Sequence, residues 1–411
     1  MRRRTPFFVV AALFGLSACS GVDDGKPPEV TMLDVPASAG SRVPHLSPVA
    51  DGSVVMSWLQ TTATGVSLQW SVLQNGRWQA AAEIARGDDW FVNWADFPSV
   101  TPITGQLWAA HWLRKKPGGA YAYDVVASLS NDAGQTWDEP FVVHDDDSAT
   151  EHGFVTLFPW QGQTNIVWLD GRNTKPGAGH HHHGGGMTLR SARFDADANV
   201  VERVEIDALV CDCCQTDVAV SAAGPVAVYR NRTEDEIRDI HVTRYVNGQW
   251  QSDRPVADDG WQIAGCPVNG PAIAAHGSDI AVSWFTAARD ELKIRLARSS
   301  DNGETFGEAV DMDSGAPTGR VDVIQHASGS SLVSWIRESD EGRSELVVRA
   351  VERSGRMGRI TKVANLSSGR ISGFPQMEWS GDDVVFAWTD TENGITRIRS
   401  AVADLEQLLR I

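Results

Sequence analysis

A short apolar segment ending in a large aromatic residue recurs along this chain at nearly constant spacing. Successive copies are 51 to 61 residues apart, and each has the hydrophobic, β-branched composition of a buried strand. The aromatic residues that end the seven copies are Trp58, Trp112, Trp168, Tyr229, Trp284, Trp335 and Trp388. A unit of this size cannot bury a core alone, so its repetition indicates a ring or an array in which neighbouring units cover each other.

Each repeat unit has the same order of expected strands. A short strand precedes the aromatic-ended strand, an alternating strand such as 187–194 follows it, and an outer strand such as 141–144 ends six units. Only 22% of the residues are charged, whereas the chain has 16 Trp and 38 Gly, which favours strands and tight turns over amphipathic helices. We therefore predict an all-β fold, a β-propeller of seven four-stranded blades, with six blades as the alternative if one unit is degenerate.

The seventh unit reaches the end of the chain before an outer strand can form. The apolar segment 29–35, near the start of the chain, precedes the first repeat unit. An N-terminal strand that completes the last blade would close the ring and cover an exposed sheet edge. We expect residues 29–411 to form a single propeller domain closed in this way.

Two turns between third and fourth strands share the pattern Ser-x-Asp-x-Gly-x-Thr-aromatic. Its defining residues are Ser130, Asp132, Gly134 and Trp137 in the first turn, and Ser299, Asp301, Gly303 and Phe306 in the second. The Asp can accept turn amides, the Gly can take a positive φ, and the aromatic ring can pack between sheets. The pattern resembles the Asp-box, or BNR, motif of sialidase-like propellers over the region from about residue 40 to the end. In that family Asp boxes lie on the face away from the site, so the resemblance implies the fold and not the activity.

The same resemblance implies a particular chemistry, which this chain matches only in part. Sialidases clamp a substrate carboxylate with three arginines, use a Tyr activated by a Glu as nucleophile, and use an Asp as acid and base. Arg42-Val43-Pro44 resembles the Arg-Ile-Pro that opens the first blade in the family. The nucleophilic Tyr of the family stands late in the chain, however, whereas the last tyrosine here is Tyr245. Ordinary retaining sialidase chemistry is therefore not expected.

Loops that lead into first strands and loops that join second to third strands share one face of a propeller, around its channel. Their polar residues include Asp96, Asp170 and Glu236, which we take as candidate catalytic carboxylates, one acting as acid and another as base or nucleophile. The candidate substrate-binding arginines are Arg42, Arg172, Arg230, Arg232 and Arg238. The alternative is that Asp170 and Arg172 form a loop salt bridge and that segment 230–239 is a solvated, self-paired connection.

Four cysteines follow the one near the N-terminus, and they too belong to this face. They are Cys211, Cys213, Cys214 and Cys266. In an oxidising compartment four cysteines favour two disulfides, although the adjacent Cys213 and Cys214 make outward pairing of both awkward. The rival interpretation is a thiolate site for copper or zinc, with His152 nearby. The run His180 to His183 is a weak, nonspecific metal binder by itself.

The first 18 residues have the features of an export signal. Three arginines precede an apolar stretch, Phe7 to Leu16, that is too short to span a bilayer as a mature helix. The residues up to Cys19 resemble a bacterial lipobox, which implies lipidation of that thiol; an ordinary cleaved signal is the alternative. Residues 19–28 are predicted to be a flexible tether. We expect a lipid-anchored protein of the cell envelope, at the outer membrane or periplasmic face.

The formal net charge of −17 argues against a nucleic-acid partner and against an anionic membrane surface other than through the lipid anchor. We expect a monomer that binds an acidic glycan or another small anion. Three functions fit the sequence: a sialidase-like glycoside hydrolase acting on terminal residues of acidic glycans, a noncatalytic propeller that binds a glycan or protein, and a copper- or zinc-binding lipoprotein. The first is narrowly favoured.

Overall fold

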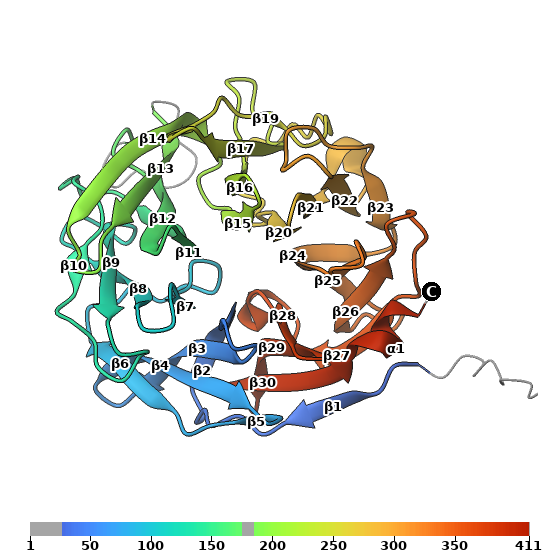
Figure 1. Cartoon of the computed structure of the whole chain (residues 1–411), viewed down its shortest axis with the longest axis horizontal. Helices are drawn as coiled ribbons and strands as arrows, with labels where there is room; N and C mark the ends of the chain where they lie inside the picture. The colour runs from blue at the N-terminus through green and yellow to red at the C-terminus, as the bar shows by residue number, and fades with distance from the viewer. Residues whose placement is uncertain (1–26, 175–184, 411) are drawn as a thin grey trace, which may run out of the picture.

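Seven antiparallel sheets stand around a common axis as the blades of a ring (Figure 1). The structure is a computed structural model that describes residues 27–174 and 185–410. The predicted export signal, Cys19 and His180 to His183 lie outside the described residues. The seven sheets confirm the predicted all-β propeller with seven blades, and the six-bladed alternative is wrong.

The first three blades follow the chain in order, with each first strand nearest the axis. They consist of β2 (Ser41–Pro48), β3 (Val54–Thr62), β4 (Gly65–Gln74), β5 (Arg77–Trp78) and β6 (Ala82–Gly87); β7 (Ser99–Pro102), β8 (Trp108–Lys115), β9 (Tyr123–Ser130) and β10 (Phe141–Val142); and β11 (His152–Trp160), β12 (Gln163–Asp170), β13 (Met187–Phe194) and β14 (Val200–Val210). In blade 1 the outer strand is split, because β5 and β6 both pair with β4.

The other four blades continue the same pattern. They consist of β15 (Asp217–Ser221), β16 (Gly224–Arg230), β17 (Ile240–Val246), β18 (Gln249–Trp250) and β19 (Arg254–Pro255); β20 (Ala272–His276), β21 (Asp279–Thr286), β22 (Lys293–Ser299) and β23 (Val310–Asp313); β24 (Pro317–Gln325), β25 (Ser331–Glu338), β26 (Ser344–Val351) and β27 (Thr361–Leu366); and β28 (Gln376–Ser380), β29 (Asp383–Glu392) and β30 (Ile395–Asp404) with β1. The helical turns are η1 (Ala288–Asp290), η2 (Arg370–Ser372) and α1 (Leu405–Leu409). No helix in the described ranges is long and apolar enough to cross a membrane.

The ring is closed by β1 (Val30–Leu33), which pairs antiparallel with β30 as the outer strand of blade 7. Val30 pairs with Ala403 and Leu33 with Ser400, so the first and last strands of the domain hold each other. The predicted closure by residues 29–35 is thus confirmed in its central part. The strand covers an edge of β30 that would otherwise present unpaired backbone groups.

The repeated aromatic residues all lie in second strands and are buried. The largest exposed fraction among the seven is 4%, at Trp112. These rings belong to the hydrophobic clusters of the core, together with aliphatic residues of neighbouring blades. The sequence period therefore reflects the packing of one blade on another.

Both Asp-box turns have the same internal hydrogen bonds. In the first, the amide of Gly134 donates to Oγ of Ser130 at 2.9 Å, and the amide of Thr136 donates to Oδ1 of Asp132 at 2.8 Å. The corresponding distances in the second turn, 299–306, are both 2.9 Å. Because these turns follow third strands, they lie at the blade ends opposite the loops that lead into first strands.

Neighbouring first strands are joined by carboxylates that accept backbone amides across the gap between blades. Oδ2 of Asp217 accepts the amide of Ile273 at 2.8 Å, and Oδ2 of Asp322 accepts that of Met377 at 2.7 Å. Burial raises the pKa of Asp217 to about 6 and that of Asp322 to about 8, although these amide hydrogen bonds oppose the shift. Carboxyl groups that gain or lose a proton near neutral pH therefore ring the channel.

Candidate functional site

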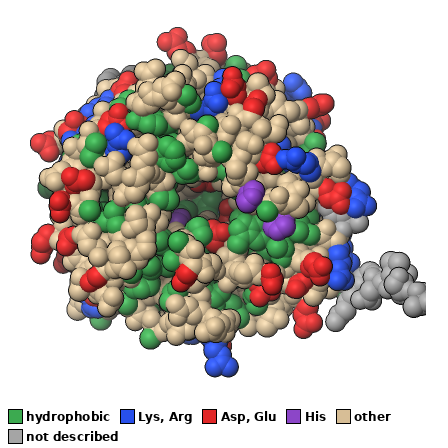
Figure 2. Space-filling view, viewed as in Figure 1, with side chains coloured by type: hydrophobic (Ala, Val, Ile, Leu, Met, Phe, Trp, Pro, Cys, Tyr) green, Lys and Arg blue, Asp and Glu red, His purple; other side chains and the backbone are tan. Residues whose placement is uncertain are grey.

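A pocket of about 650 Å³, including its open mouth, occupies the centre of the ring. Figure 2 shows the molecule hollowed at this point, with hydrophobic and acidic side chains visible inside. Every blade contributes to the wall, with one residue from each being His45, Asp96, Thr156, Gln215, Ala272, Asp322 and Phe374. A concave site built from all seven repeats at the axis is where a propeller can surround a small ligand.

Asp96 is the sequence-predicted carboxylate that the structure places in the pocket wall. It precedes β7 and is 2% exposed. Its Oδ1 accepts the amide of Phe154 at 2.7 Å, and its Oδ2 lies 2.9 Å from the hydroxyl of Tyr123. Burial raises the pKa of Asp96 to about 7, while both hydrogen bonds act in the opposite direction.

Tyr123 joins Asp96 to a second carboxyl group, that of Glu151. The Tyr123 hydroxyl lies 2.6 Å from Oε1 of Glu151, and burial raises the pKa of Glu151 well above its ordinary value. The Tyr123 hydroxyl has one proton, so it can donate a hydrogen bond to only one of these two carboxyl groups. The other carboxyl must carry its own proton and donate it to the Tyr oxygen. The Asp96, Tyr123 and Glu151 cluster therefore holds a proton near neutrality.

Sequence reasoning overlooked this cluster because Tyr123 begins a strand in which every residue is buried. Its ring stacks on Phe91 at 4.0 Å, and the residue has no exposed surface. Tyr123 is thus joined to a Glu, as the family's nucleophile is, but it comes from blade 2 and cannot touch a ligand in the pocket. Its hydroxyl instead positions Asp96. The sequence feature that could have indicated this cluster is a tyrosine, followed by Asp124, at the start of an otherwise apolar strand.

Two arginines and an aromatic pair stand beside the pocket. The guanidinium carbons of Arg320 and Arg370 lie 4.8 and 5.7 Å from the ring centre of Trp94, which stacks at 5.8 Å on the pocket residue Phe374. Burial and the charge of Arg370 lower the pKa of Arg320 to about 10. Within the described residues no carboxylate forms an ion pair with either guanidinium. Arg320 donates to Oγ of Ser372 at 2.7 Å and to the carbonyl oxygens of Gly373 and Gly369 at 3.2 and 3.0 Å. Arg370 makes no side-chain hydrogen bond within the described residues, so its guanidinium is the one of the two that is free to meet an anion.

Arg42 lies at the start of blade 1, and it is near this group because it directly precedes Val43. Cγ1 of Val43 and the backbone oxygen of Trp94 both approach Gly373, the residue before Phe374. Nε of Arg42 is buried without a hydrogen-bond partner among the described residues. Among the predicted substrate-binding arginines, Arg42 is therefore the one whose Nε has no partner in the described chain.

Arg230 is held in the interior by backbone carbonyls. It is 2% exposed and donates to the oxygens of Asn269, Phe285 and Arg238 at 2.6 to 3.0 Å. Its guanidinium also lies 4.8 Å from the ring centre of Trp261. These contacts occupy the planar donors that would be needed to hold a substrate carboxylate.

The other predicted arginines form ion pairs with the other predicted carboxylates. Glu236 lies between Arg232 and Arg238, at 2.6 and 2.7 Å, and Arg232 also contacts Asp212 at 3.1 Å. These arginines lower the pKa of Glu236, although its partial burial acts in the opposite direction. This is the self-paired arrangement that the sequence left open as the alternative for segment 230–239.

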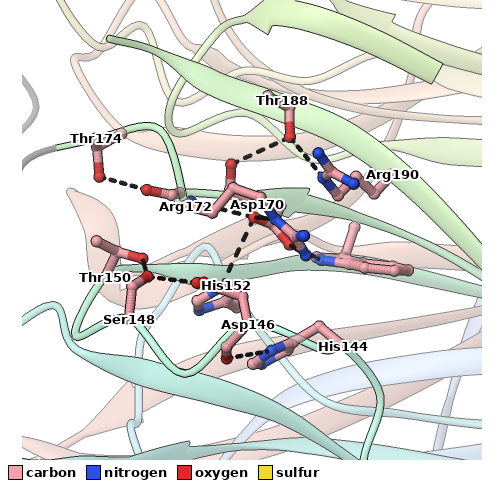
Figure 3. Close-up of polar contacts among 12 residues, drawn as sticks. His144, Asp146, Ser148, Thr150, His152, Asp170, Arg172, Thr174, Thr188 and Arg190 are labelled. Carbon is pink, nitrogen blue, oxygen red and sulfur yellow. Dashed lines mark hydrogen bonds and ion pairs between the residues drawn. The ribbon is translucent and has the colours of Figure 1, made fainter. Parts of the chain in front are cut away.

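Asp170 ends β12 in a polar cluster outside the pocket wall (Figure 3). Arg172 donates to Asp170 at 2.8 Å and to Asp145 at 3.0 Å. Despite burial, the guanidinium and nearby His152 lower the pKa of Asp170 to about 2. Asp96 and Asp170 therefore belong to different hydrogen-bond groups, the first in the pocket and the second in a loop ion pair.

His152 was predicted to lie near the cysteines, but it belongs to the Asp170 cluster. Its Nε2 lies 3.0 Å from Oδ2 of Asp146 and 3.7 Å from Oδ1 of Asp170. The ring stacks on that of His144 with centroids 3.9 Å apart. Burial, followed by the neighbouring His144, lowers the pKa of His152.

All four described cysteines come together, although Cys266 is 52 residues beyond Cys214 in the chain. The sulfurs of Cys211, Cys213 and Cys214 lie within 4.8 Å of one another, and Cys266 is within hydrogen-bonding reach of Cys213. The described residues contain no disulfide, and the sulfurs of Cys211 and Cys214 are 3.2 Å apart. Arg238 donates to Cys211 at 3.3 Å.

This cysteine group has an electrostatic environment that favours a thiolate. Burial alone would raise the pKa of Cys211. Hydrogen bonds from Cys213 and Cys214 and the charge of Arg238 outweigh that effect and hold the pKa of Cys211 well below its ordinary value. Cys211 is thus the thiolate of the group, whereas contacts with the neighbouring cysteines raise the pKa of Cys213, and burial raises that of Cys214.

A seven-bladed ring with Asp-box turns and a central polar pocket defines the class of protein. The model of the BNR repeat-like domain matches residues 60–380, most of the chain, and the chain belongs to this family. A search of curated proteins finds no match.

Several solved structures share the fold. Hadza microbial sialidase Hz136 has a TM-score of 0.50 and 14% identity over 90% of this chain and 66% of its own. Polysaccharide lyase Uly1 has a TM-score of 0.52 and 10% identity over 89% of this chain and 90% of its own. NanB sialidase from Streptococcus pneumoniae has a TM-score of 0.46 and 9% identity over 87% and 84%. At these identities the likeness shows the fold alone, and this chain spans just under two thirds of Hz136.

Proposed function

We propose that this protein hydrolyses a terminal, negatively charged sugar of a glycan bound in the central pocket. The observation that carries the proposal is Asp96, a carboxyl group in the pocket wall whose pKa of about 7 lets it keep a proton at neutral pH. A glycosidase needs such a group to protonate the oxygen of the leaving sugar. The family resemblance and the fold shared with a sialidase support a glycan as the ligand.

The two carboxyl groups needed for hydrolysis differ in pKa in the required sense. In the proposed reaction Asp96 donates its proton to the glycosidic oxygen as the bond to the anomeric carbon breaks. Asp217, which also lines the pocket and has the lower pKa, accepts a proton from the water that attacks this carbon. Solvent then returns Asp96 and Asp217 to their starting states. Asp217, which was not among the predicted catalytic carboxylates, thus fills the second carboxyl role, for which Asp170 and Glu236 were the candidates.

The guanidinium groups beside the pocket favour a negatively charged substrate. Arg370 has neither a carboxylate partner nor a side-chain hydrogen bond in the described chain, and it lies against the ring of Trp94, which stacks on Phe374, an aromatic residue of the pocket wall. Planar guanidinium donors hold a carboxylate well, and an aromatic face packs on the apolar side of a sugar ring. A sugar with a carboxylate substituent satisfies both.

The test is incubation of purified protein with oligosaccharides that end in sialic acid, a uronic acid or neutral galactose, followed by mass spectrometry of the products. We expect release of an acidic sugar with addition of one water, and no release from the neutral substrate. An unsaturated product would indicate elimination, the reaction named for Uly1, and would contradict hydrolysis. Saturable binding without any product would leave a noncatalytic glycan-binding propeller.

A second function is favoured by the convergence of the four cysteines. We propose that Cys211, Cys213, Cys214 and Cys266 hold one soft metal ion, Cu(I) or Zn(II), in a lipoprotein anchored at Cys19 to the cell envelope. The sulfurs of Cys211, Cys213 and Cys214 lie within 4.8 Å of one another, and Cys266 approaches Cys213 from a distant segment, so it could complete a tetrahedral thiolate set. Two disulfides are the competing outcome.

Thiol counting decides between these outcomes. Protein isolated without metal-affinity chromatography should bind close to one copper or zinc per chain by elemental analysis. After denaturation with a chelator it should then show four reactive thiols in addition to any at position 19. No metal and no free thiols among these four would establish disulfides and end the metal proposal.

A further inference from the structure

Two buried histidines stand face to face between blades 2 and 3 (Figure 3). His144 follows β10 and His152 begins β11, and the side chains of both are fully buried. Their rings are nearly parallel, at 10°, with centroids 3.9 Å apart. Carboxylates approach the same edge of the stack from Asp124, Asp146 and Asp170.

The backbone fixes which nitrogen of each ring carries hydrogen. Nδ1 of His144 lies 3.0 Å from the carbonyl oxygen of Asp146, and Nδ1 of His152 lies 3.2 Å from that of Tyr123. A carbonyl oxygen only accepts, so both Nδ1 atoms must donate. In the neutral ring the other nitrogen, Nε2, then has only a lone pair.

Each of these Nε2 atoms faces a carboxylate oxygen, which can accept a hydrogen bond but has no hydrogen to donate. Nε2 of His144 lies 3.4 Å from Oδ1 of Asp124 and makes no hydrogen bond within the described structure. Nε2 of His152 lies 3.0 Å from Oδ2 of Asp146. With neutral rings these contacts are repulsive. With two charged rings, like charges would stack at 3.9 Å in a buried site, which is also costly. With one charged ring, only that ring can donate to its carboxylate, and Nε2 of the other ring still faces an acceptor. A cation between the nitrogens and the carboxylates removes these conflicts.

The cluster also has more negative than positive charges, as a cation-binding site requires. Four carboxylates take part, those of Asp124, Asp145, Asp146 and Asp170. The cations in contact with them are Lys116, 2.8 Å from Asp124, and Arg172, which bridges Asp145 and Asp170. Two negative charges therefore lack a partner when both histidines are neutral, which matches one divalent ion.

We propose that His144 and His152 bind a divalent transition-metal ion through Nε2, together with the carboxylates of Asp124, Asp146 and Asp170. The ligand atoms of Asp124, His144 and His152 lie within 4.8 Å of one another, as do those of Asp146, His152 and Asp170. Ligands at 2.0 to 2.2 Å from one ion are at most about 4.4 Å apart, so each group of three needs to close by a few tenths of an ångström. The two groups share His152, and bringing both onto one ion requires a further movement of their side chains. A mixed nitrogen and oxygen set suits Mn(II) or Zn(II).

Two features of the surroundings fit a coordinating role. Metal-bound histidines commonly donate their second nitrogen to a backbone carbonyl, as both rings do here. The ligands come from both blades, so the ion would fasten β9 and the segment after β10 to β11 and β12. The site also touches Tyr123, whose hydroxyl positions Asp96. Binding should therefore stabilise the fold next to the pocket, independently of any glycan activity.

The test is titration of metal-free full-length protein with Mn²⁺, with free ion followed by electron paramagnetic resonance. Mn²⁺ is chosen because thiolates bind it poorly, which separates this site from the cysteines. His180 to His183 are replaced by serine in every sample so that this run contributes nothing. We expect one Mn²⁺ per chain, displaced by Zn²⁺, and a higher melting temperature with metal.

Variants assign the ion to its ligands. Loss of an outer hydrogen-bond partner costs about 10- to 100-fold in metal affinity, so the ligand change His144→Gln should cost about 100-fold or more. Asp146→Asn, at a partly exposed side chain that should tolerate the change, should cost at least about 10-fold. Asp145→Asn removes an exposed charge from the same cluster without removing a ligand and should stay within about 3-fold of the parent protein. Failure of the folded parent to bind Mn²⁺ or Zn²⁺ at about 1 mM, or equal losses for Asp145→Asn and Asp146→Asn, would overturn the proposal.

Discussion

Replacement of Asp96 by asparagine is expected to lower kcat/KM for the acidic glycoside by about 10²- to 10⁴-fold, the usual contribution of a general acid. The amide can still accept the Phe154 amide and contact Tyr123, so the fold should be retained. Asp239→Asn is the matched control, because Asp239 is a buried carboxylate that accepts two backbone amides away from the pocket. Steady-state kinetics checks the prediction. A loss smaller than about 3-fold for Asp96→Asn would exclude it as the proton donor.

The pH dependence of the reaction follows from the same assignment. Asp217 must be ionised and Asp96 protonated, so activity should rise through a pKa of about 6 and fall through one of about 7. The Tyr123 hydroxyl lowers the pKa of Asp96 by hydrogen bonding. Tyr123→Phe should therefore move the alkaline limb to higher pH while leaving the acid limb in place. An alkaline limb that moves to lower pH, or not at all, would contradict this role of Tyr123.

Arg230→Met is expected to lower the free energy of unfolding by about 3–5 kcal/mol, because it removes a buried, fully hydrogen-bonded cation. The carbonyls of Asn269, Phe285 and Arg238 would each lose their guanidinium donor. Denaturant unfolding followed by tryptophan fluorescence measures the change.

The control is Arg353→Met, at a surface pair with Asp279 whose guanidinium side chain is 66% exposed, where a loss below about 1 kcal/mol is expected. If Arg230 instead serves the ligand, its replacement would weaken glycan binding and leave the unfolding midpoint near that of the control.

The blade count and the ring closure were predictable because each repeat obeys a local rule. Trp58 and its six counterparts mark second strands, and segment 29–35 was the apolar strand available to complete blade 7. The loop positions also predicted that polar residues of many blades would meet at the axis. Asp96 lies in the pocket for that reason, since it directly precedes a first strand.

The partners of the polar side chains were not predictable, because they depend on how neighbouring blades are aligned. Nothing local distinguishes Arg230 and Arg320, whose guanidinium groups donate to backbone carbonyls, from Arg370, which makes no side-chain hydrogen bond within the described residues. Arg320-Val321-Asp322 does stand where blade 6 begins, as Arg42-Val43-Pro44 does in blade 1, and this likeness was a usable signal. Tyr123 gave a weaker one, since its hydroxyl reaches Asp96 at the entry to the first strand of its own blade and Glu151 at the entry to blade 3.

The most direct test of the central claim is a crystal structure of the Asp96→Asn protein soaked with an acidic disaccharide that the parent protein cleaves. We predict density for the intact sugar in the pocket, with its carboxylate about 3 Å from the guanidinium of Arg320 or Arg370 and its glycosidic oxygen at residue 96. Density only outside the pocket, or none at a concentration that saturates turnover by the parent, would contradict the account.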